Sequence, residues 1–199
     1  MCTALVWLLV MCAAKQDRQD IVRAEIDSVM KDKEPGSKIT WKDRTKMPYT
    51  QAFIRETMRC KPVNPLALMR CARADVKLGG YFVPRGSIII PSFWSLFNDP
   101  SFWKDPEVFC PERFLTNDGQ SVTKPKWFIP FSLGRRSCPG EFIADMVVFV
   151  YFANIVHYFN IEASANGVRL NDEVLGITMR PKPRKLVFRP RKRELSHET

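Results

Sequence analysis

The stretch that decides the fold is Phe131-Ser-Leu-Gly-Arg-Arg-Ser-Cys-Pro-Gly140, which precedes a long apolar run. Its glycines permit a tight loop, and proline is tolerated in the first turn of a helix. We therefore expect a loop that delivers Cys138 to the start of a helix over 139–159. A helix N-terminus and nearby cations, here Arg135 and Arg136, favour the thiolate form of a cysteine. That form binds metals or acts as a nucleophile.

The other residue types of the chain limit what this cysteine can do. There are two histidines, His157 and His197, and the six cysteines include no CxxC pair. A zinc site with several His or Cys ligands is therefore nearly excluded, and the wide cysteine spacing favours reduced thiols. A single thiolate can be the axial ligand of a haem, whose macrocycle supplies the other ligands. The alternative for an isolated Cys138 is a buried structural cysteine.

Composition and charge exclude several classes of protein. The chain has 199 residues, of which 45% are hydrophobic and 12% aromatic, so it is long enough to bury the core of one domain. The net charge of +10 is unevenly distributed, because residues 180–193 contain eight basic residues and no acidic one. Prolines interrupt this segment and the basic tail at 190–199. Nucleic acid is therefore not a predicted partner.

The apolar patterns predict helices in three parts of the chain. Two helices are expected within residues 1–30. The first is an uncharged helix over Met1–Ala14, which is too short to span a membrane, and the second continues to about Met30. A polar loop over 31–48 contains Pro35-Gly36. The third is the helix over 49–60, where Glu56 and Arg59 share one face at a spacing of three.

Short strands and an irregular segment are expected between and after these helices. A small β-region is predicted over 66–90, a short helix over 91–98 and an irregular segment over 98–130. The last part, 161–189, is predicted to form hairpin strands with a turn at Asn166-Gly167. The expected strands are Asp75–Leu78, Tyr81–Val83, Ser87–Ile90, Ile161–Ala163, Val174–Met179 and Lys185–Phe188. The expected class is mainly α with small β-sheets.

Three motifs in one order carry a resemblance to a known family. The pattern Phe131-x-x-Gly-x-Arg-x-Cys-x-Gly140 resembles the haem-binding signature of the cytochrome P-450 family. Glu56-Thr-Met-Arg59 is similar to the ExxR helix of that family, and Pro111-Glu-Arg-Phe114 to its PERF element. ExxR alone is a weak signal, but the three together, in order and spaced as in the family, are specific. The resemblance covers the whole chain and is greatest to microsomal, animal-type members.

The resemblance implies roles for the residues of the cysteine loop, the segment 131–140. Cys138 would be the axial ligand of the iron of haem b, and Phe131 would pack near the same face of the haem. Gly134 and Gly140 would let the backbone approach the cofactor. Arg136 would pair with a haem propionate. Arg70 would be a second propionate partner, with a surface arginine at a strand start as its equally weighted alternative.

Further residues take structural or substrate roles by the same resemblance. Glu56, Arg59 and Arg113 would form a buried ion-pair triad that locks the meander, 98–130, against the cysteine loop. Two segments, 65–68 and 175–178, would contact a lipophilic substrate, and core packing explains their apolar character equally well. The candidate substrate contacts are Leu66, Leu68 and Ile177.

The resemblance also implies an activity, partners and a location. Family members are monooxygenases that insert one oxygen atom of O₂ into a lipophilic substrate, with electrons from NADPH through cytochrome P-450 reductase. Lys124, Lys126 and Arg135 lie where the family docks this reductase, and a solvated face is the alternative. The expected location is the cytoplasmic face of the endoplasmic reticulum membrane, although the chain carries no anchor.

The resemblance assigns the chain to the C-terminal half of the fold, truncated at its N-terminus, because the membrane anchor and the acid–threonine motif of the distal helix are not found. We expect such a chain to be inactive alone. Two other hypotheses are a non-catalytic remnant that does not hold haem, and a basic module whose 180–193 segment binds an anionic partner.

Overall fold

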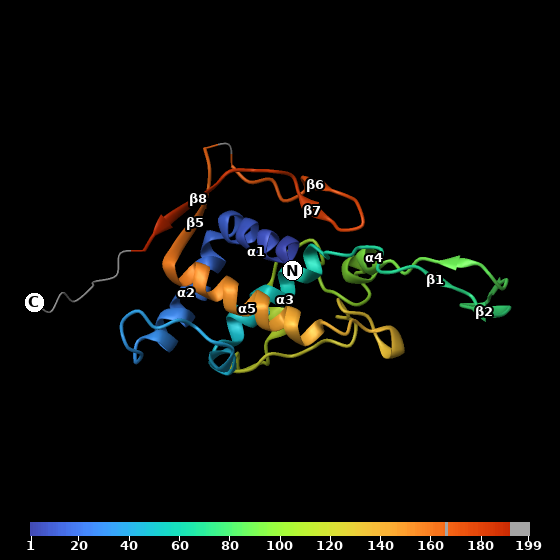
Figure 1. The fold of residues 1–199 in the computed structure, drawn as a ribbon, viewed down its shortest axis with the longest axis horizontal. Coiled ribbons are helices and arrows are strands. Elements are labelled where there is room, and N and C mark those ends of the chain that lie inside the picture. Colours follow the sequence, from blue (N-terminus) through green and yellow to red (C-terminus); the bar gives the residue numbers. More distant parts are fainter. Residues whose placement is uncertain (166, 192–199) are drawn as a thin grey trace, which may run out of the picture.

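The computed structural model describes residues 1–165 and 167–191. Helices α1, α2, α3 and α5 gather in the middle, the C-terminal strands border α1, and an arm with β1 and β2 projects from the other side (Figure 1). The helices are α1 Cys2–Ala14, α2 Gln16–Met30, η1 Trp41–Lys46, α3 Pro48–Cys60, α4 Phe93–Asn98, η2 Pro111–Phe114, η3 Gly134–Arg136 and α5 Glu141–Tyr158, where η denotes a 3₁₀ helix. The fold class is α+β, as predicted.

Helix α1 is at the centre of the main core. It contacts α2, α3, α5, β5 and β7, and its Trp7 and Leu8 side chains are fully buried. The indole Nε1 of Trp7 donates to the carbonyl of Met179, 3.0 Å away, which attaches α1 to the C-terminal strands. A helix that is apolar nearly all round requires cover on several sides, and these contacts supply most of it.

Helix α3, which carries Glu56 and Arg59, begins with an unusual cap. Its N-cap residue, Met47, has no side-chain acceptor, and the Glu25 carboxylate of α2 takes that place. Glu25 accepts from the backbone N–H groups of Tyr49 and Thr50 at 2.7 and 2.8 Å, and from the Thr50 hydroxyl at 2.6 Å. The free amides of the first turn are thereby satisfied by a neighbouring helix.

This cap leads to a prediction about the pH dependence of stability. Burial raises the pKa of Glu25 more than its hydrogen bonds to Thr50 and Tyr49 lower it. A raised pKa means that the folded state binds the Glu25 proton more tightly than the unfolded state does. The stability that this proton contributes is therefore present at low pH and is lost as the pH rises through the folded pKa. In Glu25→Gln the lost acceptor bond costs about 1 kcal/mol. Its destabilisation relative to wild type should be larger at about pH 4 than at about pH 6.

Urea unfolding at both pH values measures this difference. Glu34→Gln is the matched control, because Glu34 is exposed and its replacement should leave the pH profile unchanged. A destabilisation by Glu25→Gln that is the same at both pH values, or larger at the higher one, would contradict a raised pKa for Glu25 in the folded state.

The strands form four separate antiparallel pairs. In the arm, β1 Arg70–Cys71 pairs with β4 Ile88–Ile89, and β2 Val76–Leu78 pairs with β3 Tyr81–Val83. At the C-terminus, β5 Phe159–Ala163 pairs with β8 Leu186–Pro190, and β6 Glu173–Val174 pairs with β7 Arg180–Pro181. The arm leaves large apolar side chains exposed, among them Tyr81 at 79% and Ile88 at 69%.

Several predicted boundaries are wrong. The helix expected over 139–159 is Glu141–Tyr158, because the first intrahelical bond runs from Ala144 N to Gly140 O and makes Gly140 the cap. The strand expected over Val174–Met179 ends at Val174. The loop expected over 31–48 contains η1, which begins with a capping box between Thr40 and Asp43.

Other predictions concern the cysteines, the apolar helices and the C-terminal tail. The six cysteines, all within the described ranges, are free thiols as predicted. Within those ranges, α5 alone is long and apolar enough to cross a membrane by length and composition, while α1 is apolar but shorter. Asn166 of the predicted turn and residues 192–199 of the basic tail lie outside the described residues.

Candidate functional site: the cysteine loop and its hollow

Backbone hydrogen bonds close the cysteine loop. The N–H of Cys138 donates to the carbonyl of Phe131, 2.8 Å away, and the N–H of Ser137 donates to Gly134 at 3.0 Å. Ser132 and Gly134 both have a φ of 66°, the left-handed region that glycine enters at no cost and serine at a small one. The short helix η3 therefore turns the chain back, so that Cys138 lies beside the residue that opened the loop.

A large hollow lies against this loop. Its volume is about 770 Å³, within the range of sites for small molecules and cofactors. Cys138 is exposed and lines the hollow together with arginines and apolar side chains from distant parts of the chain. The residues from outside the loop are Met1, Ala4, Met58, Pro62, Val63, Asn64, Ala67, Leu68, Arg70, Phe93, Phe97, Pro130, Ile143, Ala144, Asp145 and Val148.

The hollow brings together most of the predicted cofactor-binding residues. Cys138, Arg136, Phe131, Gly140 and Arg70 all line it, although Arg70 is far from the other four in the sequence. A Cβ built on Gly140 would lie 3.8 Å from the Cys138 Sγ, which is ordinary contact. Gly140 is therefore not required by lack of space, and it serves as the cap of α5.

Three other predicted residues are placed differently. Gly134 is outside the lining of the hollow, and its positive φ gives it a conformational role. Of the predicted substrate contacts, Leu68 lines the hollow, whereas Leu66 does not. Ile177 is also outside the lining and is 91% exposed at the tip between β6 and β7.

The Arg70 side chain lies near the start of β1. Its Nη1 donates to the Leu68 carbonyl, 2.8 Å away.

The Glu56 carboxylate is the centre of a buried ionic cluster behind the hollow. Arg59 donates to it through Nε and Nη2 at 2.8 and 2.9 Å, and Arg113 Nε donates to Oε1 at 3.1 Å. Glu56 and Arg59 have no exposed surface, and the Arg113 side chain is 13% exposed. The N–H of Cys110 also donates to Oε1, at 2.9 Å. One carboxylate thus accepts from two guanidinium groups and one backbone amide.

The two arginines also hold the irregular segment over 98–130. Arg59 donates to the carbonyls of Phe97 and Pro106 at 2.7 and 2.8 Å. Arg113 donates to Lys104 and Val108 at 2.9 and 3.0 Å. Burial alone would lower the pKa of Arg59, but the hydrogen bonds and charge of Glu56 outweigh it and raise the pKa. This cation therefore stays charged, and its donors organise a segment with little regular structure of its own.

Sequence reasoning missed part of the wall of the hollow. Phe93 and Phe97 of α4 lie on it, and their spacing of four in an aromatic segment was the available signal. Asp145 of α5 also lies on it, four residues after Glu141. No pattern around Asp145 distinguished it from a solvated acid.

The side-chain donors around the hollow fit a metal cofactor in which an organic macrocycle supplies most of the ligands to the metal. Within residues 1–165 and 167–191, no three His, Cys, Asp or Glu side chains gather as a metal-binding set. The lone Cys138 thiol is a soft donor, and Arg136 and Arg70 are forked donors that suit carboxylates. A flat apolar macrocycle with one open axial position and two acidic substituents matches this set, and haem has that chemistry.

The cysteine loop, the buried ionic cluster and the α+β fold occur together in this chain, and comparison with known proteins shows its family. The Cytochrome P450 family model matches residues 1–188. The chain belongs to the cytochrome P450 family.

Its relatives include enzymes from distant organisms. Farnesoate epoxidase of Bombyx mori is 35% identical over 189 residues, which is 94% of this chain and 37% of that protein. Cytochrome P450 2U1 of Homo sapiens is 36% identical over 181 residues, 90% of this chain and 32% of that protein. Ferruginol synthase of Isodon rubescens is 35% identical over 180 residues, 89% of this chain and 36% of that protein. The chain thus spans about a third of the length of these relatives.

Proposed function

We propose that this chain carries the haem-ligand part of a haem-thiolate monooxygenase that acts on a lipophilic substrate. The observation that carries the proposal is the hollow of about 770 Å³, on which Cys138, Arg136, Arg70 and Phe131 converge. Family membership supports it. When bound, haem supplies the iron at which O₂ is reduced and from which one oxygen atom is inserted into the substrate.

The residues of the chain would hold this cofactor in distinct ways. The Cys138 Sγ would ligate the iron, and the closed loop between Phe131 and Cys138 would hold it in place. Arg136 and Arg70 bind the propionates, because a guanidinium can donate two parallel hydrogen bonds to one carboxylate. The aromatic side chains of Phe93, Phe97 and Phe131 exclude water from part of the rim.

Electrons, partners and location follow from the family as proposals. NADPH supplies the electrons through cytochrome P-450 reductase, for which the exposed cations Lys124, Lys126 and Arg135 form a basic surface beside the cysteine loop. The protein acts at the cytoplasmic face of the endoplasmic reticulum membrane. Of the candidate substrate contacts, Leu68 is retained because it lines the hollow. Glu56, Arg59 and Arg113 act structurally.

These 199 residues alone are proposed not to turn over substrate. The acid–threonine motif that the family carries in its distal helix is not among these residues, so the chain lacks the groups that would relay protons there. The purified chain should therefore form no product with haem, a reductase and NADPH. Product that depends on Cys138 would overturn this proposal.

Titration with haemin tests the function itself. The chain should bind one haem, retained through gel filtration and quantified as its pyridine complex. Arg136→Gln should weaken retention by about tenfold, since one charged hydrogen-bond pair is lost, whereas Arg73→Gln, on the exposed arm, should not. Failure to bind haem would favour the alternative, a non-catalytic member of the family.

A further inference from the structure

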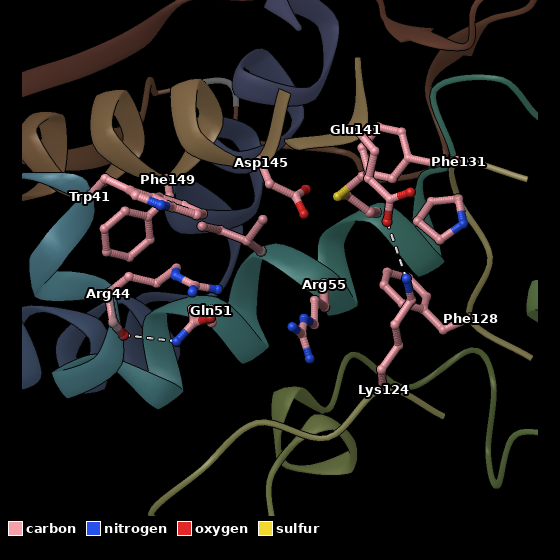
Figure 2. Close-up of a pocket in the computed structure, with 13 residues that line it drawn as sticks. Trp41, Arg44, Gln51, Arg55, Lys124, Phe128, Phe131, Glu141, Asp145 and Phe149 are labelled. Carbon is pink, nitrogen blue, oxygen red and sulfur yellow. Dashed lines mark hydrogen bonds and ion pairs between the residues drawn. The ribbon is translucent and has the colours of Figure 1, made fainter. Parts of the chain in front are cut away.

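A second, smaller pocket lies behind the cysteine loop. Its volume is about 60 Å³, about twice the share that one water molecule occupies in liquid. Figure 2 shows Arg44 of η1, Arg55 of α3 and Asp145 of α5 pointing into it from three sides. The pocket shares Met58, Pro130, Phe131 and Asp145 with the large hollow, and Cys138 is not part of its lining.

Two cations in this pocket form no close ion pair within the described ranges. Arg55 is only partly exposed, and its Nη1 donates to the neutral carbonyl of Thr123, at 2.6 Å. Arg44 lies over the Trp41 ring at 4.3 Å, and its buried Nε makes no hydrogen bond. Among residues 1–165 and 167–191, neither guanidinium forms an ion pair. Buried charge is costly unless it is paired.

The acids around the pocket do not supply the missing partner. Glu141 is already paired with Lys124 at 3.1 Å (Figure 2). Asp145 makes no ion pair within 4 Å in the part of the chain that the structure describes. Burial and the charge of Glu141 raise the pKa of Asp145 more than the charges of Arg55, Lys124 and Arg44 lower it. Burial lowers the pKa of Arg55 more than the charge of Asp145 raises it. Without the Lys124–Glu141 pair, the charged side chains of the lining are Arg44, Arg55 and Asp145. The net charge of the pocket is therefore positive.

We propose that this pocket binds a compact oxyanion, of the phosphate or carboxylate type, between Arg44 and Arg55. A pocket of about 60 Å³ suits a ligand group of a few heavy atoms. An oxyanion there would accept charged hydrogen bonds from both guanidinium groups. The bound anion would join η1, α3 and α5 directly behind Phe131, which lines the large hollow as well.

Inorganic phosphate and acetate are the probes, applied to the full chain at pH 7 and constant ionic strength set with sodium chloride. We expect saturable binding of at least one of them, seen as a rise in the unfolding temperature and in equilibrium dialysis. Arg44→Gln and Arg55→Gln should each weaken that binding by about tenfold or more, because a hydrogen bond to a charged group is lost. Arg73→Gln is the control, since it removes the same charge from the exposed arm.

Asp145→Asn separates this proposal from the competing arrangement, in which Asp145 itself neutralises the two arginines. If the pocket takes an oxyanion, this variant binds the probe more tightly, because a repelling charge is removed. If Asp145 is the partner, wild type binds neither probe beyond the chloride control, and Asp145→Asn is destabilised. That result, or binding that survives both arginine variants, would overturn the proposal. Arg44 lies on the short η1, so its variant remains informative if Arg55→Gln does not fold.

Discussion

Replacing Arg59 with alanine is expected to lower the free energy of unfolding by about 3–5 kcal/mol. The substitution leaves the Glu56 carboxylate, which has no exposed surface, with one guanidinium among the described residues, that of Arg113, and with the Cys60 thiol at 3.6 Å. It also removes the donors that hold the carbonyls of Phe97 and Pro106. The buried carboxylate therefore loses the guanidinium that donates to both of its oxygens, and the irregular segment loses its bond at Pro106. Urea unfolding measures the loss.

Arg189→Ala provides the comparison for this experiment. Arg189 also pairs with a glutamate, Glu162, at 2.7 Å, but the side chains are 65% and 36% exposed. Its loss should destabilise the chain far less than the loss of Arg59, because solvent screens an exposed ion pair. Equal destabilisation by the two substitutions, or an Arg59→Ala chain that unfolds like wild type, would mean that the ionic cluster is not what holds the segment over 98–130.

Cys138→Ala is expected to abolish thiolate ligation of haem and most haem retention. The side chain is the soft donor on the wall of the hollow, and alanine offers no ligand to iron. Stability should change little, because Cys138 is exposed. Haem per chain after gel filtration measures the effect.

Cys71→Ala is the matched control, because Cys71 is likewise exposed but lies on the arm. It should retain haem as wild type does. Full retention by Cys138→Ala, or equal losses in the two variants, would remove Cys138 from its proposed role.

The sequence was sufficient to predict the α-helices, because their signals are local. The uncharged run at 2–14, the amphipathic run at 16–30 and the Glu56–Arg59 pair each lie within one element. The start of α5 at Glu141 was missed because proline is compatible with a first helical turn, while the closing bond from Cys138 to Phe131 is visible only in three dimensions. The helix η1 was missed although Thr40 and Asp43 form a readable capping box.

The site was predictable only in part, because its members come from distant elements. Arg113 was assigned to the Glu56 cluster through family resemblance, since no local pattern joins residues 57 positions apart. Ile177 was assigned to the substrate by the same means, yet it is 91% exposed at a hairpin tip. The pocket between Arg44 and Arg55 combines side chains from η1, α3 and α5. No spacing in the sequence indicates that convergence.

The absorption spectrum of the haem-loaded, reduced chain under carbon monoxide tests the central claim most directly. Ligation by the Cys138 thiolate predicts the strongly red-shifted band of a thiolate haem in wild type and in Cys71→Ala, and its absence in Cys138→Ala. A wild-type spectrum without that band, or a band that persists in Cys138→Ala, would contradict the assignment of Cys138 as the haem ligand.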